Sequence, residues 1–174
     1  MKARFLLLPL ATAAIASPVY AKVYLSVEEA QQLMFPGATF TKQALTLTDA
    51  QAGAIEKASR TNVLNRQVQL WKVSTGGWFI ADEVVGKHEF IPIAVGLDAS
   101  GGVKDIEILE YREAYGDQVR NPKWRAQFTG KRNGARLSLT EDIQNISGAT
   151  LSSKHITDGV RRLLATYAVA IAPR

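Results

Sequence analysis

Four consecutive residues, Ser147, Gly148, Ala149 and Thr150, are the part of this chain whose residue types and spacing best suit chemistry. They stand just before a segment with the apolar periodicity of an amphipathic helix, so the threonine would present its hydroxyl at a helix N-terminus. The backbone N–H groups and the dipole at such an end favour an anion, above all a phosphate. The sequence therefore predicts a phosphate site centred on Thr150.

Small side chains and further hydroxyls surround this threonine. Gly148 and Ala149 remove side-chain bulk, while Ser147, Ser152 and Ser153 add hydroxyl donors. The structural alternative is that Ser152 or Ser153 caps the last helix and that the stretch is merely its entry turn. A threonine hydroxyl is a weak nucleophile and the local sequence supplies no base, so its covalent modification would need a separate enzyme.

Other catalytic patterns are absent from the sequence. Ser147 lacks the flanking glycines of a nucleophile elbow, and neither a Gly-x-Gly-x-x-Gly nor a Gly-Lys-Ser/Thr run occurs. The chain has no cysteine, which excludes disulfides, iron–sulfur ligation and a thiol nucleophile. The two histidines, His88 and His155, are a poor zinc set, and we interpret both as surface or hydrogen-bonding residues. Any redox chemistry must therefore come from an organic cofactor.

The first residues predict a secretory signal peptide over residues 1–21. Lys2 and Arg4 precede an apolar stretch at 5–15, and a small-residue cleavage site follows at 19–21. The apolar stretch is shorter than the roughly 20 residues that span a bilayer. We expect cleavage after Ala21 and a periplasmic mature domain at 22–174; a peptide that stays uncleaved would instead anchor the protein in the membrane.

Composition predicts one ordinary globular domain after that peptide. Of the 174 residues, 47% are apolar and 21% are charged. Removing the leader takes Lys2 and Arg4 from the 21 basic residues and leaves 19 against 16 acidic ones. This mild positive charge does not indicate nucleic-acid binding.

Local patterns predict the elements that must position Thr150. Capping boxes beginning at Ser26 and Thr48 predict two helices, the first ending near Pro36 and the second at about Ser59. A β region begins near residue 68, turns at residues 76–77, and continues through strands at 90–97 and 103–111. In the last strand we expect Ile106 and Ile108 to face the core.

Two further segments complete the predicted fold. A short helix carries Trp124 and Phe128, and a long C-terminal helix from about Ser152 packs on the sheet. Because consecutive hairpins imply antiparallel pairing, the fold class is α+β, with an antiparallel sheet and packed helices.

At these residues the chain resembles the FMN-binding domain proteins, whose flavin is attached to threonine through a phosphoester bond. That family includes the FMN-carrying subunits of the sodium-pumping NADH:quinone reductase and of the Rnf electron-transfer complex, together with small exported single-domain members. Its signature is Ser/Thr-Gly-Ala-Thr, then one residue, then Ser/Thr, which corresponds here to residues 147–152. The resemblance also includes residues 86–89, 106–113 and 124–131, so it covers about residues 84–167.

The resemblance implies an exported electron carrier with FMN attached to Thr150. A separate FAD-dependent flavin transferase would make the bond, and a membrane redox protein would serve as electron donor or acceptor. One position departs from the family: Gln144 stands where members usually carry Asp, and Asp142 is out of register. That departure bears on covalent attachment more than on flavin binding.

Aromatic and acidic residues within residues 111–128 are candidates for lining the isoalloxazine ring, because stacking and hydrogen bonds tune a bound flavin. The foremost are Tyr111, Glu113, Tyr115 and Trp124, with ordinary core packing as the alternative for Trp124. A set of basic residues is interpreted as solvated surface rather than as a docking patch, namely Lys87, Lys131, Arg132 and Arg136.

Two other classes of function stay open from the sequence. One is an exported binding or assembly module that keeps the fold without flavin, which Gln144 favours. The other is a flavin reductase that turns over a small substrate at a loosely held cofactor. No residue set suggests a metal site.

Overall fold

The computed structural model describes residues 22–113 and 115–172, so the expected signal peptide and its cleavage site lie outside the described residues. Its centre is a five-stranded antiparallel sheet of order β2-β3-β4-β5-β6. These strands are β2 (Phe40–Thr46), β3 (Gln67–Val73), β4 (Trp78–Val85), β5 (Phe90–Leu97) and β6 (Val103–Ile108). The helices are α1 (Val27–Met34), α2 (Asp49–Ser59), α3 (Pro122–Arg125) and α4 (Thr150–Thr166). This architecture confirms the predicted α+β class.

Both predicted capping boxes form and fix the starts of α1 and α2. The Ser26 hydroxyl accepts the Glu29 N–H at 3.1 Å, and the Glu29 carboxylate accepts the Ser26 N–H at 2.7 Å. Thr48 and Gln51 make the same reciprocal pair at 3.2 and 2.9 Å. Each pair satisfies backbone donors that the first helical turn leaves open.

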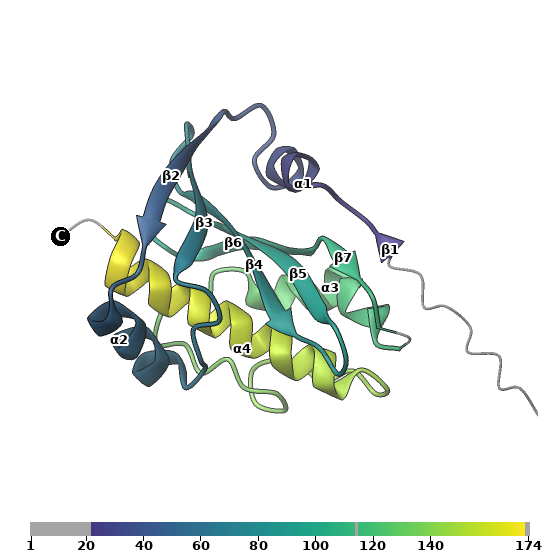
Figure 1. Cartoon of the computed structure of the whole chain (residues 1–174). Helices are drawn as coiled ribbons and strands as arrows, with labels where there is room; N and C mark the ends of the chain where they lie inside the picture. The colour runs from purple at the N-terminus through teal and green to yellow at the C-terminus, as the bar shows by residue number, and fades with distance from the viewer. Residues whose placement is uncertain (1–21, 114, 173–174) are drawn as a thin grey trace, which may run out of the picture.

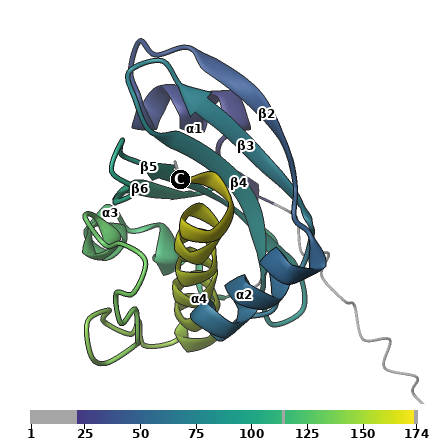
Figure 2. The same cartoon turned by 90° about the vertical axis from the view of Figure 1, so that its left-hand side faces the viewer.

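Helices cover both faces of the sheet. Helix α4 crosses one face (Figure 1), and its Ile156 and Val160 belong to one hydrophobic core cluster with Ile80, Ile93 and Ile106 of the sheet. Helix α1 lies over the other face, with α2 beside α4 (Figure 2). As predicted, the last long strand points its isoleucines into the core, since Ile106 and Ile108 are each 1% exposed. No helix among the described residues is both long and apolar enough to cross a membrane.

The strand predicted over 103–111 is broken, and Pro92 explains why. Its first part, β6, ends at Ile108, and β7 (Glu110–Tyr111) pairs with β1 (Lys22–Val23) instead of β5. The Leu109 N–H still reaches the Pro92 carbonyl at 2.9 Å, but proline has no N–H to return. The Leu109 carbonyl instead accepts the N–H groups of Tyr24 and Leu25. The chain thereby leaves the sheet and forms the loop that runs toward α4.

Candidate functional site

Helix α4 begins without a side-chain cap, unlike α1 and α2. At 17 residues it is the longest described helix, yet its N-cap position is Ala149, whose side chain has no acceptor group. No described residue accepts a hydrogen bond from the backbone N–H groups of Thr150, Leu151 or Ser152. The first intrahelical bond runs from Ser153 N–H to the Ala149 carbonyl at 2.9 Å. Three donors and the positive end of the helix dipole are therefore available to an anion.

Thr150 is the first residue of α4 and is exposed, so its hydroxyl is accessible at this helix end. The side-chain amide of Asn145 donates to Thr150 Oγ1 at 3.1 Å. Gly148 adopts a φ of +82°, which favours glycine, and a Cβ there would meet no atom within 4 Å. The glycine is thus needed for its backbone conformation, while the space around it stays open.

The interpretation that Ser152 or Ser153 caps the helix is wrong. Both serines lie inside the first turns of α4 and are buried, whereas Ser147 is exposed. The Ser153 hydroxyl is fully buried and has no hydrogen-bond partner among the described residues. We expected Ser152 and Ser153 as hydroxyl donors to a phosphate, but the structure places both side chains in the interior.

A hydrogen-bonded link joins α4 to the loop that follows β7. The Tyr111 hydroxyl lies 2.7 Å from both the Tyr115 carbonyl and Ser152 Oγ. A phenol has one proton, so when it donates to the carbonyl it accepts from Ser152. Burial raises the pKa of Tyr111 and keeps the phenol protonated. At Gly116, where φ is +105°, a Cβ would crowd Ser152 Oγ at 2.8 Å.

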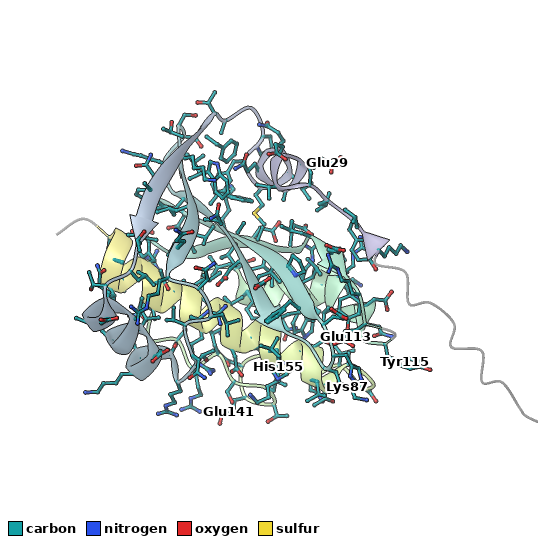
Figure 3. All side chains as sticks on the ribbon, viewed as in Figure 1. Glu29, Lys87, Glu113, Tyr115, Glu141 and His155 are labelled. Atoms are coloured by element: carbon teal, nitrogen blue, oxygen red, sulfur yellow. The ribbon has the colours of Figure 1, made fainter. Side chains whose placement is uncertain are left out.

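Glu113 holds the hairpin at residues 86–89, which connects β4 and β5. Its Oε1 accepts the backbone N–H groups of His88 at 2.6 Å and Glu89 at 3.1 Å. Partial burial would raise the pKa of this carboxyl, but these N–H groups and that of Lys87 outweigh burial and lower it. The carboxylate is therefore already used by the protein. Figure 3 shows Glu113, Lys87 and Tyr115 at the same end of the molecule.

The structure brings Tyr111, Tyr115 and Ser152 together beside the start of α4 but places Trp124 differently. Tyr115 is 85% exposed, whereas Trp124 is buried and packs edge-to-face on Phe128 with ring centroids 5.2 Å apart. The indole N–H donates to the Gln144 carbonyl at 2.7 Å. Trp124 thus supports the segment that leads into the motif, in line with the core-packing alternative.

Asp142 does not take the place of the carboxylate that is missing at position 144, where this chain has Gln144. Its carboxylate accepts the N–H groups of Leu137 at 3.2 Å and Ser138 at 2.8 Å, and pairs with Lys131 Nζ at 2.8 Å. Burial opposes the charged form, but these partners together lower the Asp142 pKa. This acid is therefore committed to the loop in which it lies.

Sequence reasoning missed two residues of this region. Asn145 contacts the threonine hydroxyl, and its position in the polar turn before the motif was the available signal. Gly116 permits the close approach of the 111–116 loop to Ser152, which no local pattern indicates. His155 also differs from expectation, since its Nδ1 is buried without a described hydrogen-bond partner.

Comparison with known proteins finds a family model that matches part of this chain. Residues 86–165 match the FMN-binding domain. A similar protein is one of the subunits of the proton-translocating ferredoxin:NAD(+) oxidoreductase complex of Clostridium ljungdahlii, which is 28% identical over 131 residues. That alignment covers 69% of this chain and 71% of the relative. The family match includes the hairpin, the loop after β7 and the start of α4.

Proposed function

We propose that this chain belongs to the FMN-binding domain family and carries electrons on an FMN bonded through its phosphate to the Thr150 hydroxyl. The flavin ring supplies the chemistry of accepting and releasing electrons. The observation that carries the proposal is the uncapped start of α4, where an exposed threonine hydroxyl stands beside three free N–H groups.

The residues present fit a phosphate at Thr150. Helices α1 and α2 each begin with a capping box, but α4 has no side-chain cap and leaves the N–H groups of Thr150, Leu151 and Ser152 open. A phosphate ester on the threonine oxygen carries negative charge, which these donors and the helix dipole stabilise. Gly148 adds no side chain that would crowd the group.

Attachment requires a second protein, because Thr150 has no base beside it. Among the described residues, the Asn145 side-chain amide donates a hydrogen bond to the Thr150 hydroxyl oxygen. An amide does not take up a proton at neutral pH, so Asn145 cannot serve as the base. A separate flavin transferase must therefore remove the hydroxyl proton while the threonine oxygen attacks the FMN phosphorus of FAD, so that the pyrophosphate bond breaks, AMP leaves and the phosphoester bond forms. Asn145 holds the threonine oxygen for that reaction.

Different residues of the 111–124 region would have different roles toward the flavin. Exposed Tyr115 and the protonated Tyr111 are the candidates for contact with the ring, by stacking or by hydrogen bonding. Glu113 acts as a positioning residue, since its carboxylate is taken by the hairpin N–H groups. Trp124 positions the segment before the motif, because its indole N–H donates to the Gln144 carbonyl.

We propose a membrane redox protein as the electron-transfer partner. We also propose that this chain is exported and works in the periplasm. The relative from Clostridium ljungdahlii belongs to an oxidoreductase complex, which supports transfer of electrons within an assembly. The apolar stretch and small-residue site within residues 1–21 support cleavage after Ala21 and a periplasmic location. A relay also suits the described residues better than a reductase, because they form no substrate-activating constellation.

A denaturing gel of protein produced with its flavin transferase tests the attachment. We expect a flavin-fluorescent band for the wild type and for Ser147→Ala, with the latter weaker, because Ser147 belongs to the motif but does not bear the bond. Thr150→Val keeps a β-branched side chain but lacks the oxygen, so its band should vanish. A band of wild-type intensity in Thr150→Val would overturn the assignment.

A further inference from the structure

A hollow of about 590 Å³ lies between the end of α2 and the loop at residues 133–141. Arg60, Arg136 and Arg161 line it, with Glu141 as the one acid among its described lining residues. Three positive charges stand against Glu141 and against Asp158, which pairs with Arg161 beside the lining, so the cluster has a net charge of +1. In Figure 3, Glu141 lies at the edge of the molecule, away from Glu113 and Tyr115. The hollow is therefore a positively charged surface distinct from the start of α4.

Arg161 fixes the walls of this hollow. Its guanidinium donates to the Ser59 carbonyl at 2.6 Å and to the Leu137 carbonyl at 2.7 Å, and it pairs with Asp158 at 2.6 Å. Ser59 ends α2 and Leu137 belongs to the loop, so one side chain of α4 ties both rims together. The hollow is thus formed before any ligand arrives.

Arg60 and Arg136 are exposed arginines that a ligand can reach, although the sequence alone indicated only solvated surface for Arg136. Arg60 follows α2 with a left-handed φ of 56°, is exposed, and makes no ion pair with a described residue. Arg136 pairs with Glu141 at 2.7 Å, but their side chains are 74% and 47% exposed. Water screens such a pair and leaves it weak, so an incoming carboxylate can replace Glu141. The pair also shows that a carboxylate fits against Arg136.

We propose that this hollow is a docking site for an acidic segment of a partner protein, with Arg60 and Arg136 binding its carboxylates. The guanidinium fork matches a carboxylate with two hydrogen bonds. The volume equals that of about twenty water molecules at ~30 Å³ each, so one small inorganic ion would leave most of it to solvent. An acidic side chain with its backbone fills the space better.

Docking here leaves Thr150 accessible. Arg161 is eleven residues beyond Thr150 on α4, which corresponds to roughly 16 Å along the helix axis. A bound partner would therefore sit beside the helix that carries the threonine without covering its first turn. Arg60 also lies outside the 86–165 family match, so the site depends on the preceding part of the chain.

Titration of the full chain with an acetylated hexaglutamate peptide, followed by NMR chemical shifts, tests the proposal. We expect Arg60→Gln and Arg136→Gln each to weaken binding roughly twofold to fivefold, as for exposed charge pairs. Glu141→Gln should strengthen it, because the competing carboxylate is removed. Arg112→Gln is the control, since that arginine pairs with Glu110 outside the hollow.

Three results would overturn the proposal. The first is hexaglutamate affinity that is unchanged in the Arg60→Gln, Arg136→Gln double variant. The second is weaker binding in Glu141→Gln. The third is inorganic phosphate that binds as tightly as the peptide and displaces it, which would make the hollow a site for free anions. None of these outcomes bears on the bond to Thr150.

Discussion

Replacing Glu113 by Gln should loosen the hairpin at residues 86–89 and lower stability in a pH-dependent way. The substitution keeps the side-chain oxygen that accepts the His88 and Glu89 N–H groups, but it removes the negative charge. Hydrogen bonds to a charged acceptor contribute more than those to a neutral one. The loss therefore measures the charge rather than the presence of an acceptor.

The expected loss in the free energy of unfolding is about 1 kcal/mol at pH 7. A hydrogen bond to a charged group contributes ~1.5–3 kcal/mol to stability. The Glu113 bonds lie at an exposed hairpin, so solvent screening reduces the difference between charged and neutral acceptors. For a chain of this size, a loss of about 1 kcal/mol lowers Tm by roughly 2–4 °C.

The pH dependence has a definite sign. The folded pKa of Glu113 is below its ordinary value, so its contribution is present above the unfolded pKa, about 4.3 for Glu. It is lost as the pH falls through the folded pKa. The difference in the free energy of unfolding between wild type and Glu113→Gln should therefore be widest near pH 7 and should close in acid. Protonation of Asp142 and other carboxylates destabilises both proteins equally and does not change this difference.

Urea unfolding of both proteins in steps from pH 7 downward measures this gap, with hydrogen exchange at the His88 and Glu89 amides as a local readout. Exchange at these amides should be faster in the variant at pH 7. A gap that is absent at pH 7, or one that widens in acid, would refute the argument that the carboxylate holds the hairpin.

Three further outcomes are expected. Gly159→Ala gains about 1 kcal/mol of helix propensity, but the added Cβ would overlap Val84 Cγ1. Urea unfolding should therefore show a net loss of about 1 kcal/mol in the free energy of unfolding. A more stable variant would contradict the close packing of α4 on β4. Tyr111→Phe removes the hydroxyl that joins the Tyr115 carbonyl to Ser152, and should lower the free energy of unfolding by about 1 kcal/mol while flavin attachment persists. Sequencing the N-terminus of exported protein should find residue 22 first, whereas a retained Met1 in the membrane fraction would indicate an anchor.

Local signals in the sequence predicted most elements of the fold. The capping boxes at Ser26 and Thr48 located α1 and α2, because reciprocal side-chain and backbone bonds need only a three-residue spacing. Alternation located the faces of β6, since Ile106 and Ile108 lie in the core. What failed was the length of that strand, which depends on Pro92 in the neighbouring strand and on a contact with the N-terminal segment.

The candidate site was predictable in part for the same reason. The small residues before Thr150 and the apolar period after it indicated a helix start, and α4 begins at that residue. Which serines point inward could not be predicted, because that depends on how α4 rotates against the sheet and the Tyr111 loop. Glu113 was expected to line the flavin, but its backbone partners lie more than twenty residues earlier in the chain.

The central claim is that FMN is bonded to Thr150, and an intact-mass measurement tests it most directly. Wild-type chain and Thr150→Ala would each be produced with the matching flavin transferase, exported, purified and denatured before weighing. We predict that the wild type gains the mass of one FMN less one water and that Thr150→Ala gains nothing. A wild type without added mass, or the same added mass on Thr150→Ala, would contradict the claim.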